Sequence, residues 1–385
     1  MKIGIPKETH PGEKRVPLIP DGVKKLTDSG ADVEIEAGLG DSIAEGDSNY
    51  QEAGASLASD RHSLLSSSDI VLRLRKPPSQ EVGALKKGSI HVSFLDPFNE
   101  GELVDKLAAA GVSAISMEMI PRTTKAQKMD ALSSQANLAG YVAVIVAARQ
   151  LNRILPMMTT PSGTIAPARV FVIGAGVAGL QAIATARRLG ARVEAYDTRP
   201  VVEEQVRSLG AKFVKIDIGE TGQTKQGYAK ALTEEQLEMQ RQAMAKICAR
   251  SDVVITTAQL FGRPAPRIVS ADMVRGMKPG SVLVDLAVES GGNVEGSSPG
   301  ETVDVGGAKV VGLTNLPGEA AVHASQMYSA NLVNLIGEFW DQESKAFNLD
   351  LEDEIIQGCL ITHNGEVCNQ MLLDIRRKQQ EQKEG

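Results

Sequence analysis

Polar side chains of several chemical types gather in the stretch PRTTKAQKMDALSSQANLAGY, Pro121 to Tyr141. Within twelve residues it offers cations, an amide, a carboxylate and a hydroxyl: Arg122, Lys125, Gln127, Lys128, Asp130 and Ser133. An apolar run with almost no charge follows, which predicts that a buried helix begins near residue 132. Donors and acceptors placed together at the mouth of a helix are suited to holding a carboxamide and a ribose.

A second candidate site is the glycine triplet Gly174, Gly176 and Gly179, between the predicted strand RVFVI and a predicted helix. In the pattern G-x-G-x-x-G, the first glycine permits a tight turn and the second lets the backbone approach a pyrophosphate. The third allows close contact between helix and strand, and the helix N-terminus favours the negative charge of the phosphates. We therefore expect the turn, including Val177 and Ala178, to hold a dinucleotide; the alternative is a tightly packed turn that binds no ligand.

The next predicted strand, RVEAY, is followed by Asp197, about twenty residues beyond the glycines, where a ribose-binding carboxylate is expected. A carboxylate accepts hydrogen bonds from ribose hydroxyls and repels the 2′-phosphate of NADP(H), so Asp197 favours NAD(H). Arg199 is a complication, because an arginine there can accommodate that phosphate or can simply be a solvated loop charge. We place Thr198 and Arg199 beside Asp197 in the predicted cofactor site.

The chain has five histidines, and no motif marks one of them as a catalytic acid or base. A dehydrogenase acting on an alcohol or amine normally needs such a group beside the nicotinamide. His62 lies in a polar helix and His363 in a predicted turn, so we expect both at the surface, whereas His10 and His91 are possible cleft residues. No set of cysteines and histidines has zinc-ligand spacing, so no metal site is predicted.

Length, charge and hydropathy limit the class of protein. A chain of 385 residues is expected to form about two domains. The net charge of −7 argues against nucleic-acid binding, which needs a clustered basic face. No apolar run reaches the roughly 18 to 20 residues that span a bilayer, since the best candidate, Leu138 to Ala148, is too short. The N-terminal MKIGIPKETH lacks the apolar region of a signal peptide, which favours a soluble, cytoplasmic chain.

Three cysteines provide no disulfide framework. Cys359 and Cys368 flank LITHNGEV, a predicted hairpin that turns on its Asn-Gly pair. A two-residue turn would place Ile361 opposite Cys368 and Gln370 opposite Cys359. The two thiols would then be diagonal neighbours, so we expect no disulfide between them.

Short strands alternate with helices along the N-terminal third, which predicts a mostly parallel sheet with helices on its faces. The predicted strands there are KIGIP, ADVEIEAG, DIVLRLR, GSIHVSFL and VSAISMEMI. A second unit begins at Arg169, with strands RVFVI, RVEAY, AKFVKID, SDVVITTA, GSVLVDLAV and AKVVGLTNL. Two long apolar helices, roughly Leu132–Leu151 and Ala324–Trp340, are natural connectors. The expected fold class is therefore α/β: two Rossmann-like, doubly wound parallel-sheet domains joined by two long helices, with a cleft between them.

We predict that the C-terminal segment rejoins the first domain. The expected boundaries are residues 1–131 with 325–385 for the N-terminal domain, and 132–324 for the NAD(H)-binding domain with its connecting helices. The tail RRKQQEQKEG is polar and is expected to fray.

The segment Gly219 to Gln236, GETGQTKQGYAKALTEEQ, is a long polar insert between two predicted strands. It carries Gly222 and Gly227 beside Tyr228, and inserts of this kind often act as lids over a ligand. The alternative is a surface loop with an incidental tyrosine.

Three long motifs carry a resemblance to a known family: PRTTKAQKMDALSSQANLAGY, GAGVAGLQAIATARRLGA and TTAQLFGRPAP. They resemble the NAD(H)-binding subunit of proton-translocating nicotinamide nucleotide transhydrogenase, and the similarity runs through almost the entire chain. The resemblance implies that this chain binds NADH and passes hydride to NADP⁺ on a partner subunit, while membrane-spanning subunits couple the exchange to proton movement. It also implies a homodimer that lies at the inner face of the membrane through its partners.

By this resemblance, four residues of the opening stretch line the nicotinamide with its ribose and phosphates: Arg122, Gln127, Asp130 and Ser133. Gly227 and Tyr228 belong to a mobile loop that folds over bound nucleotide. The adenine side is bordered by three residues that follow a strand: Ala258, Gln259 and Leu260. Direct transfer between two nicotinamides moves no substrate proton, so such a site needs positioning rather than a catalytic histidine. Asp130 and Ser133 also have a simpler interpretation, as a helix cap and a first-turn hydroxyl.

Alanine dehydrogenase is a rival interpretation. It shares the two-domain fold and the pattern PKE…GEKRVPL, and Arg15 and Lys76 here resemble its substrate-carboxylate-binding residues. In that enzyme a histidine follows the strand corresponding to VSFL and an aspartate precedes the Gly-Gly pair, where this chain has Asp96 and Glu289. Loss of the histidine removes the acid/base group that imine chemistry needs. A third hypothesis is a non-catalytic NAD-binding module, which the polar cluster at Pro121–Ser133 disfavours.

Overall fold

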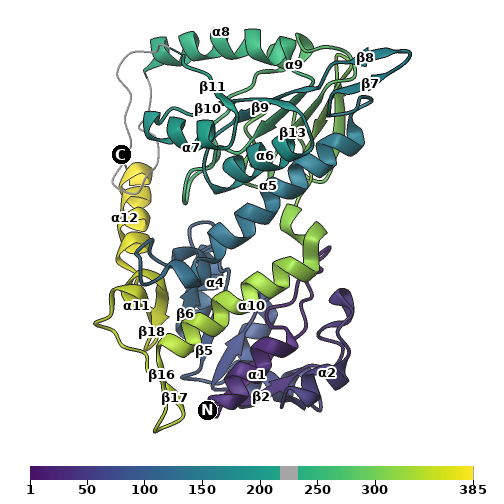
Figure 1. The fold of residues 1–385 in the computed structure, drawn as a ribbon. Helices are drawn as coiled ribbons and strands as arrows, with labels where there is room; N and C mark the ends of the chain where they lie inside the picture. The colour runs from purple at the N-terminus through teal and green to yellow at the C-terminus, as the bar shows by residue number, and fades with distance from the viewer. Residues whose placement is uncertain (217–232, 385) are drawn as a thin grey trace. The chain divides into compact units, whose positions relative to one another are not determined.

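The computed structural model describes residues 1–216 and 233–384. The chain divides into two compact units, Met1–Gln135 with Gly318–Gly385, and Ala136–Pro317. Each unit is built around a sheet of its own (Figure 1). The α/β class and the Rossmann-like parallel sheets predicted from the sequence are confirmed.

The first unit contains an eight-stranded sheet in the order β19-β18-β6-β5-β4-β1-β2-β3. Its six N-terminal strands pair in parallel, and β18 and β19 are added antiparallel at one edge. The strands are β1 Lys2–Ile5, β2 Asp32–Ile35, β3 Ser56–Leu57, β4 Ile70–Leu72, β5 Ile90–Ser93, β6 Ser113–Ser116, β18 Leu360–His363 and β19 Glu366–Val367. Strands β4, β5 and β6 are buried along their whole length, as expected for parallel strands covered by helices on both faces.

The helices of this unit follow the predicted alternation, with α10 a long central one (Figure 1). They are α1 Pro20–Asp28, α2 Asp47–Glu52, α3 Arg61–Ser67, α4 Gly101–Ala109, α10 Ala321–Glu338, α11 Glu354–Cys359 and α12 Gln370–Glu384. Short 3₁₀ turns lie at Asp41–Ile43 (η1), Ser79–Ala84 (η2), Met117–Met119 (η3) and Gln127–Met129 (η4), and a small hairpin pairs β16 Trp340–Asp341 with β17 Ala346–Phe347.

The second unit contains a seven-stranded sheet in the order β11-β10-β9-β12-β13-β15-β14. All pairs are parallel except β14 with β15. The strands are β9 Arg169–Ile173, β10 Arg192–Tyr196, β11 Lys212–Phe213, β12 Val253–Thr256, β13 Val282–Asp285, β14 Thr302–Val305 and β15 Ala308–Val311. The chain builds outward from β9 in one direction and then restarts on its other side with β12. In open parallel sheets, ligands bind at the carboxyl ends of the strands where the order reverses in this way.

Alternate residues of the central strands enter two separate apolar cores, which explains the continuous apolar runs in the sequence. On β9, Val170 and Val172 join the core formed with helices α5 and α6, whereas Phe171 and Ile173 join the core formed with α8 and α9. The helices are α5 Ala131–Gln150, α6 Val177–Arg188, α7 Glu203–Ser208, α8 Glu234–Arg250 and α9 Ala271–Arg275, with 3₁₀ turns η5 Pro200–Val202 and η6 Val288–Ser290 and a separate hairpin of β7 Met158–Thr160 and β8 Gly163–Ile165. A further turn, η7 Leu316–Ala320, precedes α10.

Helix α5 corrects one expectation from the sequence, because an apolar segment long enough to cross a membrane is present by length and composition. Gly140 and Tyr141 do not interrupt the helix: Gly140 is buried, and a Cβ there would lie 2.1 Å from the Ala178 carbonyl oxygen. Core helices of soluble proteins pass the same test, and Ala143 and Ala147 belong to the apolar core of the second unit. One such helix is weak evidence for a membrane span.

The C-terminal segment corrects two further expectations. The tail was expected to fray, but α12 continues to Glu384, and Arg376 anchors its middle through Asp105 (2.6 Å) and the Gly101 carbonyl oxygen (3.1 Å). His363 was expected at the surface, but it is half-buried and its Nδ1 lies 2.9 Å from the Ser113 hydroxyl. His62 is exposed, as predicted.

The predicted hairpin is present, with Thr362 paired to Val367. The Cys368 N–H donates to the Ile361 carbonyl oxygen (2.9 Å), so this half of the expected register is confirmed. The other half, with Gln370 opposite Cys359, is wrong because α11 ends at Cys359 and α12 begins at Gln370. Both cysteines are free thiols, as expected.

His91 is fully buried inside the first unit, where it interacts electrostatically with the buried Arg73. Arg73 donates to Glu81 Oε2 (2.7 Å), and its carbonyl oxygen accepts from the Tyr328 hydroxyl (2.9 Å). His91 contacts Ser93 through Nε2 (3.1 Å), and its buried Nδ1 has no hydrogen-bond partner among the described residues. Burial, assisted by the Arg73 cation, lowers the pKa of His91 to about 3. The imidazole is therefore neutral and shielded, which makes it unsuited to acid/base work near neutral pH.

We predict that His91 makes the free energy of unfolding depend on pH between about 6.5 and 3. The unfolded ring binds a proton below its ordinary pKa of 6.5, whereas the folded ring stays neutral down to about 3, so acid favours the unfolded state. The destabilisation is absent above pH 6.5 and grows as the pH falls. His91→Asn should reduce the slope by up to about 1.4 kcal/mol per pH unit in urea unfolding.

The matched control is His62→Asn, which removes an exposed imidazole and should retain the wild-type slope. Equal slopes for the wild type and His91→Asn would contradict the prediction.

Candidate functional site

The three glycines of the second unit have different structural reasons to be glycine. Gly174 has φ +98°, and a Cβ there would lie 2.5 Å from the Thr257 hydroxyl. A Cβ on Gly179 would lie 1.9 Å from the Gly174 carbonyl oxygen, so close contact between α6 and β9 excludes any side chain. Gly176 differs, because a Cβ there would meet nothing within 4 Å. Packing requires the first and third glycines, whereas the second faces open space that a ligand could occupy.

Helix α6 begins directly after Gly176, which is its N-terminal cap residue. The first N–H groups of a helix have no partner within the helix and carry partial positive charge. In α6 these belong to Val177, Ala178 and Gly179, beside the open space at Gly176. The arrangement is suited to a phosphate group.

Asp197 follows β10 and binds the backbone of the glycine turn directly. Its carboxylate accepts from the Ala175 N–H (2.8 Å) and from the backbone N–H of Arg199 (2.8 Å). The Arg199 guanidinium adds a two-point ion pair, with Nε 2.9 Å from Oδ1 and Nη2 2.8 Å from Oδ2. Burial alone would raise the pKa of Asp197, but the hydrogen bonds from Arg199 and Ala175 outweigh it and hold the pKa below its usual value. The carboxylate is therefore ionised at neutral pH, and the Arg199 side chain is directed to it.

The loop after β12 is held by a buried asparagine that sequence reasoning missed. The Asn293 side chain accepts from the Ala258 N–H (3.0 Å) and donates to the Ala258 carbonyl oxygen (2.8 Å). The Asn293 backbone N–H donates in turn to Asp285, a fully buried carboxylate that also accepts from Thr256 Oγ1 (3.2 Å). An aspartate ending the apolar run VLVD was the signal in the sequence, because a buried charge needs partners.

The other two residues of this loop are exposed. Gln259 donates from Nε2 to the Leu286 carbonyl oxygen (3.3 Å), and Leu260 forms a bridge with Arg263. Since β10, β9 and β12 are adjacent, the glycine turn, the Asp197 loop with the half-buried Thr198, and the Ala258 loop meet at one edge of the sheet. Sequence positions up to 86 apart are thus gathered where the strand order reverses.

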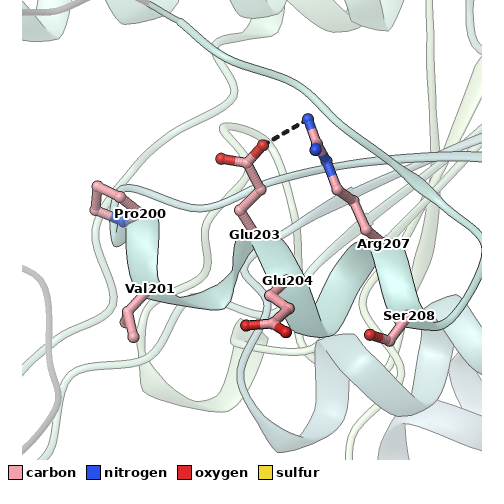
Figure 2. A pocket seen from close by; sticks show the side chains of 6 residues that line it. All are labelled: Pro200, Val201, Glu203, Glu204, Arg207 and Ser208. Carbon is pink, nitrogen blue, oxygen red and sulfur yellow. Dashed lines mark ion pairs between the residues drawn. The ribbon is translucent and has the colours of Figure 1, made fainter.

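A shallow hollow of about 680 Å³ lies just beyond this site, after the Asp197 loop (Figure 2). Its lining comes from η5 and α7: Pro200, Val201, Glu203, Glu204, Arg207 and Ser208. Glu203 pairs with Arg207 (2.7 Å), as the figure shows, and also with Lys215 (3.1 Å). With two carboxylates in its lining, the hollow is not suited to phosphate.

The polar stretch of the first unit forms a compact turn. Ala126 and Met129 are fully buried, whereas Arg122 and Gln127 are exposed. Asp130 accepts from the Ser133 backbone N–H (2.8 Å) and from the Ser133 hydroxyl (2.6 Å), which is the geometry of a cap at the start of α5. The structure thus brings Asp130 and Ser133 together as a capping pair, and the simpler interpretation of these two residues describes their contacts here.

Two predicted site residues, Gly227 and Tyr228, lie outside the described residues, as does most of the predicted lid. Thr233, where the description resumes, caps α8 and exchanges reciprocal hydrogen bonds with Gln236. Within residues 1–216 and 233–384, no group of three or more histidine, cysteine, aspartate or glutamate side chains could hold a metal ion.

Arg15 and Lys76, the residues that resemble a substrate-carboxylate site, are engaged by carboxylates of the chain itself. Buried Arg15 donates to Glu13 through Nε (2.8 Å) and Nη2 (2.7 Å), and to Gln135 through Nη1 (2.8 Å). Burial alone would raise the pKa of Glu13, but Arg15 and Arg75 lower it to about 2. Lys76 lies 2.5 Å from a Glu100 oxygen. The cations are therefore neutralised within the first unit.

The two positions that replace the histidine and aspartate of alanine dehydrogenase also have local partners. Asp96 has φ +53° and accepts from Asn99 Nδ2 (2.8 Å). Glu289 is exposed and accepts from the Asn315 N–H (3.1 Å). His10, the remaining candidate acid/base residue, is exposed, and its Nδ1 lies 3.2 Å from the Pro11 carbonyl oxygen.

Comparison with known proteins gives a consistent result along the chain. Residues 4–139 match the model for the alanine dehydrogenase/PNT N-terminal domain, and residues 143–370 match the model for the alanine dehydrogenase/PNT C-terminal domain. The chain is 44% identical over 379 residues to an NAD(P) transhydrogenase subunit alpha polypeptide of Rhodospirillum rubrum, covering 97% of this chain and 99% of that one.

A solved transhydrogenase structure from Sinorhizobium meliloti matches with a TM-score of 0.86 at 44% identity, covering 95% of this chain and 100% of that one. Alanine dehydrogenase of Mycobacterium tuberculosis is more distant, at 33% identity over 302 residues, with 78% of this chain and 76% of that enzyme covered.

We predict that Asp197→Ala raises the dissociation constant for NADH by roughly ten- to a hundredfold, the loss expected for hydrogen bonds to a charged group. The same change deprives Arg199 of its carboxylate, so the preference for NADH over NADPH should fall. Titration of nucleotide fluorescence measures both constants. Glu194→Ala is the control, because it removes a carboxylate of β10 that pairs instead with Arg250. An unchanged constant for Asp197→Ala would refute the ribose assignment.

Proposed function

The chain belongs to the alanine dehydrogenase/PNT family, and we propose that it is the NAD(H)-binding subunit of a proton-translocating NAD(P) transhydrogenase. In this function the chain binds NADH and delivers hydride directly to NADP⁺ on a partner subunit. Membrane-spanning subunits couple the exchange to proton movement, and the chain acts as a homodimer at the inner face of the membrane through those partners.

The observation that carries the proposal beyond family membership is the neutralisation of Arg15 by Glu13. An amino-acid dehydrogenase must offer a cation to its substrate carboxylate and an acid/base group to the substrate nitrogen. Here the guanidinium is buried and already has hydrogen bonds to Glu13 and Gln135. Asp96 and Glu289 stand where alanine dehydrogenase has its histidine and aspartate. An alanine dehydrogenase activity is therefore the less supported alternative.

The residues of the second unit fit the adenosine and pyrophosphate parts of NAD(H). Gly176 leaves open space at the start of α6, where helix N–H groups favour a phosphate. Asp197 keeps an ionised carboxylate for the ribose hydroxyls, and the Ala258 loop, fixed by Asn293, borders the adenine. Bound NADH supplies the hydride itself, so this chain needs no proton-transferring side chain.

The residues of the first unit would position the nicotinamide. Gln127 is exposed and carries an amide donor and acceptor, which can pair with a carboxamide or a ribose hydroxyl. Arg122 provides a cation for a phosphate, and the Asp130–Ser133 pair fixes the start of α5 beside this turn. Tyr228 and Gly227 complete the proposed set as members of a covering loop.

One assay separates the three functional hypotheses. The purified chain with NADH is mixed with an NADP⁺-loaded partner subunit, and separately with NAD⁺ and alanine. Hydride transfer that requires the partner is the expected result. Turnover of alanine by the chain alone would support the dehydrogenase alternative, and binding of NADH with no reaction in either mixture would support a non-catalytic module.

We predict that Gln127→Asn slows hydride transfer to the partner by about tenfold or more, while the dissociation constant for NADH changes by about twofold or less. Shortening the side chain by one methylene disturbs the placement of the ring, and an error of about 1 Å can cost up to about a hundredfold in rate. Stopped-flow transfer and equilibrium titration measure the two effects. Equal losses in rate and binding would contradict an orienting role.

A further inference from the structure

Three side chains of α10 converge on the turn that carries Gln127. Asn331, Asn334 and Glu338 are spaced by three and four residues, so they share one face of the helix. The Nδ2 groups of both asparagines donate to the same acceptor, the Lys128 carbonyl oxygen, each at 3.0 Å. This carbonyl belongs to η4, a 3₁₀ turn of only three residues.

Asn331 also binds the chain beyond that turn. Its Oδ1 accepts from the Ser134 hydroxyl (2.7 Å), and its side chain is almost fully buried. One carboxamide therefore joins the end of η4 to the first turn of α5, on either side of the Asp130 cap. Both functions of the Asn331 amide are used, so substitution would leave a buried carbonyl with one donor fewer.

Ion pairs add to the same contact from the exposed side. Glu338 lies 2.7 Å from the Lys128 ammonium and 3.4 Å from that of Lys125. Lys125 also pairs with Asp353 (3.0 Å), which caps α11. Hydrogen bonding from Lys128 and Lys125 lowers the pKa of Glu338. These lysines are exposed to solvent, and exposed pairs contribute little, so the buried carboxamide is the stronger restraint.

The restraint fixes the backbone of the turn and leaves its central side chain projecting outward. Ala126 and Met129 point into the core, whereas Gln127 between them is exposed. A single 3₁₀ turn has too few hydrogen bonds to hold one conformation by itself. The direction of the Gln127 side chain therefore depends on contacts from α10, which lies far along the chain, as the separation of 203 positions between Asn331 and Lys128 shows.

We propose that Asn331 is a positioning residue for hydride transfer, which acts by holding the Gln127 turn through the Lys128 carbonyl. The inference rests on the proposed function, because it takes Gln127 as the group that orients the nicotinamide. Asn334 and Glu338 support the same turn from its exposed side, with smaller effects.

The experiment compares Asn331→Ala with Ser329→Ala in the complete chain, mixed with the NADP⁺-binding partner. Ser329 is a matched control, because it is also buried on α10 but its hydroxyl accepts from the Ile19 N–H (3.3 Å), away from η4. The substrates are NADH and an NADP⁺ analogue whose reduced form absorbs at a wavelength different from that of NADH. Urea unfolding of each variant shows the loss of stability.

Asn331→Ala should reduce the transfer rate by roughly tenfold, with an NADH dissociation constant within about twofold of the wild type. Ser329→Ala should lose stability and keep the wild-type rate. Asn331→Asp serves if the alanine variant does not fold: it keeps the acceptor for Ser134 but loses the donor to Lys128, so it should also be slow. Asn331→Ala combined with Gln127→Asn should be no slower than Gln127→Asn alone, because both act through one side chain.

The outcomes are distinguishable. If the wild-type chain transfers hydride and Gln127→Asn is slow, but the Asn331 variants keep the wild-type rate, the inference alone is overturned. The same holds if Ser329→Ala slows transfer as much as Asn331→Ala, or if the double variant shows additive losses. If the wild-type chain gives no transfer with the partner, the proposed function is overturned and the inference with it.

Discussion

The close approach of helix α6 to strand β9 is the constraint on which the nucleotide-binding unit depends. Gly179 lies so near the Gly174 carbonyl oxygen that a Cβ would come within 1.9 Å of it. Any side chain there would force the helix away from the sheet, and the first turn of α6 would move with it. Because that turn carries the unpaired N–H groups, one backbone contact determines both the packing of the core and the position of the phosphate site.

Buried polar groups then fix the loops around this turn. Asp197 holds the Ala175 N–H and the Arg199 guanidinium, and the Asp285–Asn293 pair holds the loop at Ala258. In the first unit, charged side chains satisfy one another, as Arg15 does with Glu13. Both units thus use their polar residues to define geometry. This use agrees with a reaction in which the protein aligns two nicotinamides and moves no substrate proton.

Much of the fold followed from local patterns, because alternating apolar runs and glycine turns report short-range geometry. The strand–glycine–helix–strand unit from Arg169 to Tyr196 is as predicted, with α6 beginning at the expected turn. Errors arose where tertiary contacts outweighed local signals. Gly140 was expected to interrupt an apolar segment, but the helix continues because that glycine packs against Ala178. The polar tail stays helical because Arg376 reaches Asp105.

The sequence by itself determined the α/β class, the glycine turn, the ribose carboxylate at Asp197 and the polar stretch around Gln127, since each depends on residues close together in the chain. Only the tertiary structure decided the partners of those groups. Asn331 binds Lys128 across 203 positions, Asn293 binds Ala258 across 35, and the Arg15 cation is closed off by Glu13 and Gln135. Hydrogen-bond partners distant in sequence leave no periodic signal, because they are chosen by the packing of whole helices and strands.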